Sequence, residues 1–347
     1  MSLPLNIFTP MQAAILIGVA ALLGAVFGSF VNCLAWRLVH GESVLVGRSH
    51  CTSCGHSLGV LDLIPVVSWL ALRGRCRHCG ERVSPRYLMV ELLMAALFAA
   101  LLVVYGVGAP WLAYAVLACI LMGASLVDLD TYTIPNGFVI AAAAVWLLMM
   151  AASFAGAIGF PLVPAAMREP AALVTADSLL AGAAPEAVSS VFGVGSLFAP
   201  LVGAGWPAGL LDGLAGGLLV GGGILLFSLV FDAVTGKTSL GGGDVKLLFA
   251  VGLFLGAALS LLNLLVACVL GLVFAAFRLR GAPSAPCGKA VKGAAGEGGG
   301  ASLEGASPES VPPPVDKAIP FGPAIAAATM LTLLGGPLVL TWYVGLF

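Results

Sequence analysis

The fold is decided by the stretch Gly241-Gly242-Gly243-Asp244-Val245-Lys246, which separates two long apolar runs. One run ends near Phe231 and the next begins at Leu247. A carboxylate at the boundary of a membrane helix is unfavourable unless it faces water, a partner or a cavity. Three preceding glycines let backbone or a ligand come close, and a helix that begins here carries Asp244 near its first turn, where negative charge is tolerated. By itself, the motif is equally compatible with a glycine turn capped by an aspartate.

Composition places the chain in a membrane. Of its 347 residues, 60% are hydrophobic and 9% are charged, and the mean hydropathy is +1.09, whereas globular proteins carry about 25% charged residues. We therefore predict an all-α polytopic membrane protein. A net charge of −1 provides no basic face for nucleic acid. No Lys or Arg precedes the first apolar run, so we expect that run to remain attached as a span.

Apolar runs of about 17–25 residues are the candidate spans, and they must be helical because lipid cannot satisfy free backbone groups. The chain contains about eight of them. The division of the long run that follows Asp244 rests only on the polar residues Ser260 and Asn263. The predicted spans are 11–36, 87–106, 110–127, 137–157, 207–231, 246–261, 262–280 and 320–345.

The basic residues orient these spans. With the N-terminus outside, only Arg168 of the fifteen Lys and Arg residues falls on the outer side. Because Lys and Arg favour cytoplasmic loops, this orientation is strongly preferred. It places the acidic residues Asp128, Asp130 and Asp244 on one face, the cytoplasmic one. The predicted cytoplasmic stretches are 37–86, 128–136, 232–246 and 278–319.

Four of the eight cysteines form two CxxC pairs. Cys51 and Cys54 are separated from Cys76 and Cys79 by 21 residues, and a glycine follows each pair. Four thiolates at this spacing suit a tetrahedral zinc ion. Two disulfides are the alternative, but the loop is predicted to be cytoplasmic and reducing. We expect a structural zinc site that holds together a loop too small for a core of its own.

The acidic residues suggest the chemistry. Asp128 and Asp130 lie at the inner end of the third span, and because residues two apart on a helix point to nearly opposite sides, at most one can share a site with Asp244. Two carboxylates brought together share a proton, so one can deprotonate water while the other protonates a departing amine. The alternative is a set of solvated boundary carboxylates. Glu91, one turn into the second span, is either functional, paired with Arg86 or able to reach the membrane interface.

Taken together, the motifs resemble those of the bacterial type IV prepilin peptidases, the prepilin leader peptidase/N-methyltransferases of the GxGD aspartic protease family. The resemblance runs along nearly the whole chain. Only the outer segment 158–206 and the linker-like segment 281–317 look longer than the family needs. The matching stretches are Gly28–Asn32 with Arg37-Leu38, the two CxxC pairs, Ile64–Leu70, Arg86-Tyr87, Val90–Leu92, Asp128–Asp130 with Pro135-Asn136, Gly241–Asp244 with Lys246-Leu247, and Pro320–Pro323.

The resemblance implies two activities that serve type IV pilus biogenesis or type II secretion. One is cleavage of the leader peptide of type IV prepilins or pseudopilins on the cytoplasmic side of the bacterial inner membrane. The other is methylation of the new N-terminal amine by S-adenosyl-L-methionine, for which the sequence names no binding residues. The resemblance also implies that Asp128, rather than Asp130, pairs with Asp244.

These expectations divide the chain into three parts. They are a first transmembrane helix (11–36), a cytoplasmic four-cysteine zinc-binding domain (37–86) and a seven-helix membrane peptidase domain (87–347) that includes 158–206 and 281–317. A transporter that uses the acids as ion carriers is one rival, although it would place them at mid-membrane and often show an internal repeat. A non-catalytic scaffold for pilus assembly is the other.

Overall fold

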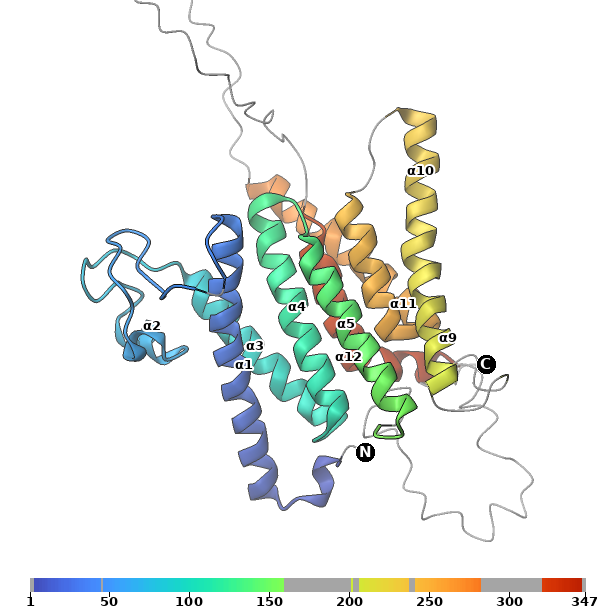
Figure 1. The fold of residues 1–347 in the computed structure, drawn as a ribbon, viewed down its shortest axis with the longest axis horizontal. Helices are drawn as coiled ribbons and strands as arrows, with labels where there is room; N and C mark the ends of the chain where they lie inside the picture. The colour runs from blue at the N-terminus through green and yellow to red at the C-terminus, as the bar shows by residue number, and fades with distance from the viewer. Residues whose placement is uncertain are drawn as a thin grey trace, which may run out of the picture.

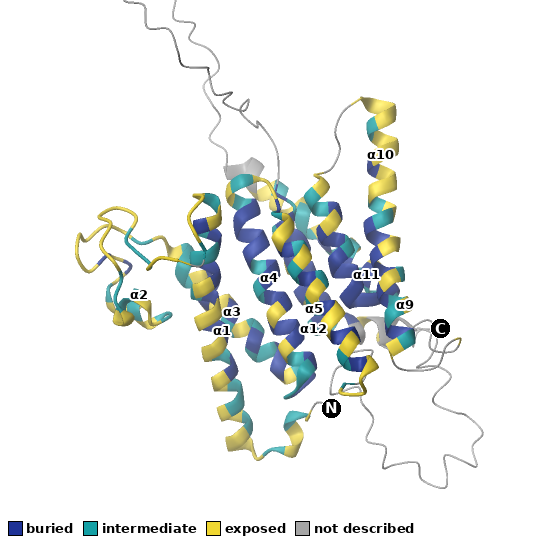
Figure 2. Ribbon diagram, viewed as in Figure 1, coloured by how far each residue is buried: buried dark blue, intermediate teal, exposed yellow. Residues whose placement is uncertain are grey.

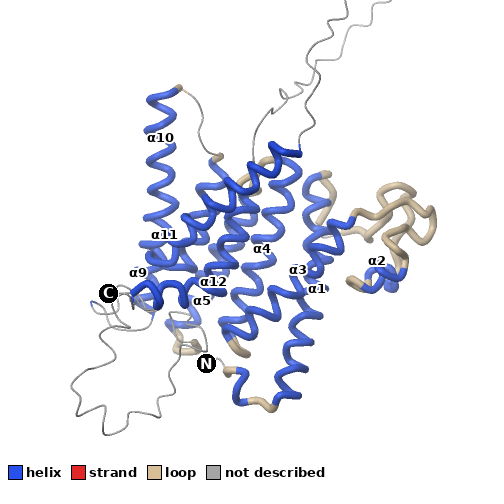
Figure 3. Tube along the Cα trace, turned by 180° about the vertical axis from the view of Figure 1, so that it is seen from behind, coloured by secondary structure: helices blue, strands red, loops and turns tan. Residues whose placement is uncertain are grey.

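The computed structural model describes residues 3–44, 46–158, 201, 206–236, 241–281 and 320–344. The described chain is helical, and its only β-type pairings are isolated bridges (Figures 1 and 3). Both the outer insert 158–206, apart from its ends and residue 201, and the linker 281–317, apart from its first residue, lie outside the described residues. The elements are η1 (Leu5–Ile7), α1 (Pro10–Val39), η2 (Val60–Leu63), α2 (Val67–Ala71), α3 (Pro85–Tyr105), α4 (Ala109–Thr131), α5 (Asn136–Phe154), α9 (Trp206–Gly217), η4 (Leu218–Gly222), α10 (Gly223–Thr235), α11 (Gly242–Gly281) and α12 (Gly322–Val344).

The predicted count of about eight spans is confirmed within the described residues. Six helical stretches are long and apolar enough to cross a membrane, and α9, η4 and α10 form one of them, Trp206–Thr235. Another is α11, which is two helices joined at a kink. α12 adds a shorter apolar stretch, Gly322–Gly336. Dividing α11 at its kink and adding α12 to the six gives eight segments.

The position predicted for the break in α11 is wrong. The chain leaves helical geometry at Gly256, with φ 70° and ψ 179°, and not near residues 261 and 262. Only glycine readily adopts this conformation. Ser260 and Asn263, which suggested the later break, are each 1% exposed. Both are buried within the helical part of α11 and do not mark a loop.

Asp212 of α9 faces the kink. Its Oδ1 atom accepts a hydrogen bond of 3.4 Å from the backbone N–H of Ala257, just after the break. A Cβ atom at Gly256 would collide with the same carboxylate. The backbone groups freed by the kink are thus met by a side chain of the neighbouring helix, as a membrane interior requires.

Small residues set the closest helix packing. Gly24 and Gly28 of α1 lie against the backbone of α3, and Gly216 and Gly221 of the α9–η4 segment lie against α11. A Cβ atom at any of these four positions would come within about 3 Å of its neighbour, so glycine is what allows the backbones to approach. Of the six long apolar stretches, α4 is the most enclosed, since 67% of its most apolar part is buried (Figure 2).

One end of the bundle gathers the acidic motifs. α4 and α10 end there, α5, α11 and α12 begin there, and α10 extends beyond the other helices (Figure 1). Pro135 is the N-cap of α5, at the predicted break. The segment between α1 and α3 (40–84) carries the two CxxC pairs and is called the cysteine-containing segment. It lies to the side of α1, away from α11, and leads directly into α3 (Figures 1 and 3).

Candidate active site and cysteine cluster

Asp128 lies inside α4, in its last turn, and is only 4% exposed. It was expected at the inner end of the third span, whose predicted bounds were 110–127. The helix instead continues to Thr131 and ends where Tyr132 takes a left-handed conformation and donates its N–H to the carbonyl of Asp128. The Asp128 carboxylate faces α12, where Oδ2 accepts a hydrogen bond of 2.9 Å from the backbone N–H of Gly322.

Asp244 lies in the first turn of α11, as the glycine motif predicted. Its backbone N–H donates to the carbonyl of Gly241 at 3.0 Å. A Cβ atom at Gly243 would lie 3.1 Å from that of Ile134, so Gly243 packs against the α4–α5 loop. Lys246 strengthens this contact by donating from Nζ to Asn136 Oδ1 at 3.0 Å.

These contacts place Asp128 and Asp244 at the same end of the bundle. The negative charge of Asp128 acts on Asp244, and α12 packs against both α4 and α11, the helices that carry the two acids. Two acids from different helices therefore lie near one another at one end of the bundle. Such a pair can hold one proton between its members.

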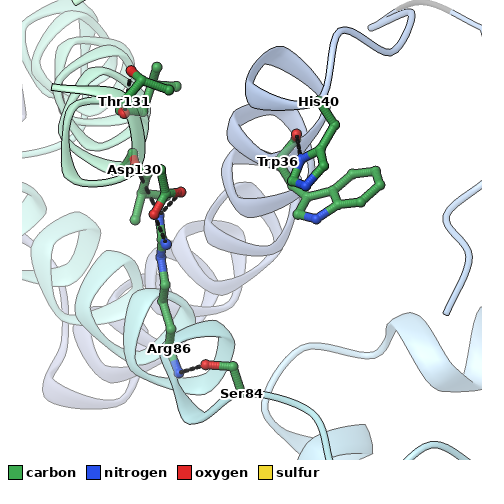
Figure 4. A network of polar contacts seen from close by, with 8 residues as sticks. Trp36, His40, Ser84, Arg86, Asp130 and Thr131 are labelled. Atoms are coloured by element: carbon green, nitrogen blue, oxygen red, sulfur yellow. Dashed lines mark hydrogen bonds and ion pairs between the residues drawn. The ribbon is translucent and has the colours of Figure 1, made fainter. Parts of the chain in front are cut away.

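Asp130 takes no part in that pair. Its two carboxylate oxygens accept hydrogen bonds of 2.7 and 2.9 Å from the guanidinium of Arg86 on α3 (Figure 4). Arg86 is therefore not the partner of Glu91. Glu91 is 7% exposed, and its Oε2 accepts a hydrogen bond of 2.7 Å from the backbone N–H of Val66, which attaches the cysteine-containing segment to α3.

Two further residues of the site carried no signal of their role in the sequence. Gly322 supplies a backbone donor, which no side chain reveals. Arg86 lies 44 residues from Asp130 in the chain. Both lie in stretches that match the family's motifs, so the resemblance marked their positions without showing what they contact.

The four cysteines form one cluster. The Sγ atoms of Cys51, Cys54, Cys76 and Cys79 all lie within 4.8 Å of one another, and together they could hold a metal ion. Backbone N–H groups of Cys54 and Ser53 lower the pKa of the Cys51 thiol to about 6, which favours the thiolate form that binds metals.

The two CxxC turns share one design. Gly55 and Gly80 have φ of 68° and 74°, a left-handed conformation that suits glycine. In each turn the glycine N–H donates to the carbonyl of the first cysteine, at 2.9 and 3.0 Å respectively. Asp62 joins the halves of the segment, since its Oδ1 accepts a hydrogen bond of 2.7 Å from Arg77 Nε.

A cavity of about 850 Å³ lies between α1, the cysteine-containing segment and the start of α3. Aromatic, acidic and basic side chains line it, and so do Cys51 and Cys76 of the cysteine cluster. Among the other lining residues are Trp36, Trp69, Tyr87, Asp62, Glu91, Arg37 and Arg75. A cavity of this size and mixed polarity is typical of small-molecule sites.

The described fold and sites define a polytopic helical membrane protein with two carboxylates near one another at one end and, beside the bundle, a cysteine cluster that could hold a metal ion. Two family models match the sequence. Residues 22–105 match the bacterial peptidase A24 N-terminal domain, and residues 185–276 match the type IV leader peptidase family.

Curated relatives agree. A type 4 prepilin-like proteins leader peptide-processing enzyme of Escherichia coli is 31% identical over 76% of this chain and 86% of its own length. The prepilin leader peptidase/N-methyltransferase of Bacillus subtilis is 25% identical over 95% of this chain and 98% of its own, and that of Myxococcus xanthus is 40% identical over 39% and 38%. No solved structure matches the chain. The chain belongs to the type IV leader peptidase family, a bacterial family of multi-pass membrane proteins.

Proposed function

We propose that the protein is an aspartic endopeptidase that removes the leader peptide of type IV prepilins or pseudopilins, with Asp128 and Asp244 as its catalytic pair. The proposal is carried by the position of these two carboxyl groups near one another, on α4 and α11, with Asp128 hydrogen-bonded to Gly322 at the N-terminus of α12. Relatives across most of the chain are named for leader-peptide processing. The role would be in pilus biogenesis or type II secretion.

The mechanism follows from a shared proton. The ionised member of the pair removes a proton from water, which attacks the carbonyl carbon of the scissile amide, and the protonated member then gives its proton to the departing amine. The C–N bond breaks and leaves a carboxylate on the leader and an amine on the mature pilin. The N–H of Gly322 holds one oxygen of Asp128 at 2.9 Å, which fixes the direction of that carboxyl group.

We propose zinc for the cysteine cluster. Tetrahedral zinc binds sulfur at about 2.3 Å, and four sulfur atoms within 4.8 Å of one another fit around one such ion. Cys51, Cys54, Cys76 and Cys79 would hold the metal. Its role is structural, since four thiolates leave no position open for a substrate.

The second activity is methylation of the new N-terminal amine. S-adenosyl-L-methionine would supply an electrophilic methyl group from a sulfonium centre. The cavity beside α1 suits such a donor, because aromatic faces attract cations and Glu91 adds a buried carboxylate. We assign Trp36 and Tyr87 as ring contacts and Glu91 as the acidic contact for the donor.

The proposed setting is the bacterial inner membrane with the N-terminus in the periplasm. The end of the bundle that carries Asp128 and Asp244 then faces the cytoplasm. A basic leader peptide stays on the same side, because Lys and Arg next to a membrane span favour the cytoplasm. The division at 37–86 into a zinc-binding domain, flanked by the first helix and the 87–347 peptidase domain, belongs to the same proposal.

The peptidase is tested with purified protein and a prepilin in detergent micelles. Mass spectrometry should find mature pilin that has lost its leader and, once S-adenosyl-L-methionine is added, gained one methyl group. Intact prepilin after incubation with folded protein would overturn the proposal and favour a transporter or a scaffold.

The donor site is tested by calorimetric titration with S-adenosyl-L-methionine, which carries the sulfonium charge, in the absence of prepilin so that no methyl transfer occurs. Trp36→Ala should raise the Kd by about 10-fold, the equivalent of one desolvated cation–π contact of ~1–2 kcal/mol. Trp342→Ala is the matched control, because Trp342 lies exposed on α12. Equal affinity in the two variants would show that the donor binds elsewhere.

A further inference from the structure

Arg86 makes more contacts than an ion pair requires. Besides its two hydrogen bonds to Asp130, the guanidinium donates from Nη2 to the backbone carbonyl of Leu126 at 3.0 Å. Leu126 and Asp130 stand two residues before and two residues after Asp128. A single side chain of α3 therefore contacts the last turn of α4 at residues that precede and follow Asp128, and Figure 4 shows its contact with Asp130.

The last turn of α4 needs such a cation. The C-terminal end of a helix carries partial negative charge, and an aspartate there is unfavourable. α4 places Asp128 and Asp130 in this turn and has no basic residue of its own there. Arg86 supplies the missing positive charge from a neighbouring helix.

The contribution of this contact is positional. The side chains of Arg86 and Asp130 are 38% and 35% exposed, and pairs this exposed add little to stability. A planar guanidinium that donates to both oxygens of a carboxylate and to a backbone carbonyl still fixes the orientation of the groups it binds.

Arg86 also sits where the cysteine-containing segment enters α3. Ser84 caps that helix, and its Oγ accepts the N–H of Arg86 at 3.3 Å (Figure 4). The residue before it, Val83, is bound into the cysteine-containing segment. Its N–H donates to the carbonyl of Gly74 at 2.8 Å, and its carbonyl accepts from Trp69 Nε1 at 3.3 Å.

We propose that Arg86 is a positioning residue that links the four-cysteine segment to Asp128. The folded segment fixes Val83 and Ser84, these fix the start of α3, and Arg86 then holds the turn of α4 that presents the catalytic carboxyl group. The inference rests on the proposed peptidase function. It gives the cysteine cluster a task in leader cleavage although its metal touches no substrate.

The test measures kcat and KM of leader cleavage for three variants. Arg86→Gln should lower kcat by about 10- to 100-fold, the effect expected of a small misplacement of a catalytic group, with little change in KM. Arg86→Lys should fall between that variant and wild type. The double variant Arg86→Asp with Asp130→Arg, which exchanges the two charges, should recover part of the kcat that is lost in Arg86→Gln. Arg82→Gln is the matched control, an exposed arginine of the same segment, and should cleave like wild type.

The link to the cysteines is tested by a double-mutant cycle. If Cys76→Ser acts through Arg86, its loss of kcat and that of Arg86→Gln should not multiply in the double variant. If the two losses of kcat multiply in the double variant, the cysteine-containing segment and Arg86 act independently. Unchanged kcat in Arg86→Gln, or no recovery in a folded exchanged pair, would overturn the positioning role.

Hydrogen–deuterium exchange keeps this test separate from the peptidase proposal. Arg86→Gln should speed exchange of the backbone amides over residues 126–131, whether or not the protein cleaves prepilin, while Arg82→Gln leaves them unchanged. If wild type fails to cleave but this exchange still rises, the peptidase proposal fails and the contact stands. If exchange is unaltered, the positioning role fails.

Discussion

At the scale of single residues, Asp128 is held by backbone rather than by charged partners. Its carboxylate accepts the N–H of Gly322, and its carbonyl accepts that of Tyr132. Asp130, two residues further along the chain, forms an ion pair with Arg86. Two neighbouring acids thus have different surroundings, and the surroundings decide which of them remains for chemistry.

The pairing predicts the effect of isosteric substitutions. Asp128→Asn or Asp244→Asn keeps the shape of the site but removes the shared proton, so each should slow leader cleavage by about 10²–10⁴-fold or more. The double variant should be no worse than either single one, because the pair acts as a unit. Cleavage of a purified prepilin measures this.

Asp130→Asn is the matched control for that series. An asparagine still accepts a hydrogen bond from Arg86, so the variant should keep substantial activity. An inactive Asp130→Asn beside an active Asp128→Asn would show that the pairing is wrong. Two active single variants would rule out aspartic protease chemistry.

Gly322 predicts a second loss of activity. A Cβ atom at this position would lie 2.7 Å from Oδ2 of Asp128, so Gly322→Ala must push the carboxylate aside. We expect kcat to fall by about 10- to 100-fold. Gly335→Ala in the same helix meets nothing within 4 Å and should cleave normally. Equal rates for the two variants would exclude the contact with Gly322 as a constraint on Asp128.

At the scale of elements, the apolar runs of the sequence predicted the helices well, because a span must be long, apolar and helical in lipid. They could not predict the break in α11. Gly256 stands in an unbroken apolar run, and Asp212, which accepts a hydrogen bond from Ala257 just after the kink, lies 45 residues from Ala257 in another helix.

The kink predicts a stability difference. Gly256→Ala would force a side chain into a conformation that only glycine readily adopts, at about 1–3 kcal/mol, and would add a collision with Asp212. The melting temperature of the detergent-solubilised protein should fall. Gly223→Ala should not lower it, since a Cβ atom there meets nothing within 4 Å. If both variants melt like wild type, the kink imposes no such restriction.

The cysteine cluster predicts a metal. Purified protein should contain close to one zinc ion per chain by elemental analysis, and Cys76→Ser should lower that content and increase proteolysis within 39–85, because the metal replaces a core. Cys268→Ser, an exposed position on α11, should keep the metal. A wild-type segment that resists proteolysis equally well without zinc would contradict a structural role.

At the scale of the whole molecule, the acids share one end of the bundle, as the distribution of basic residues suggested. What the sequence could not predict was which acids meet. That depends on Gly243 packing against Ile134 and on α12 lying against both α4 and α11. These are contacts between distant segments, and residue types alone do not encode them. The family resemblance named Asp128, while helix geometry left the choice between Asp128 and Asp130 open.

The topology predicts the result of reporter fusions. A reporter inserted within 281–317 should be active as a cytoplasmic fusion, and one within 158–206 as a periplasmic fusion, since fourteen of the fifteen basic residues then lie inside or at that boundary and only Arg168 lies outside. Paired cytoplasmic and periplasmic reporters at each site provide the control. The opposite pattern would move Asp128 and Asp244 to the periplasmic face.

The hydrogen bond between Gly322 and Asp128 spans 194 residues of sequence, and this has a consequence for biosynthesis. The ribosome delivers Asp128 and Asp244 to the membrane long before it delivers the N-terminus of α12. Until α12 is inserted, the carboxylate of Asp128 lacks its backbone donor. A nascent chain that stalls or is truncated before Gly322 carries both aspartates without the donor that orients Asp128, so we expect leader cleavage to begin only after α12 has been inserted.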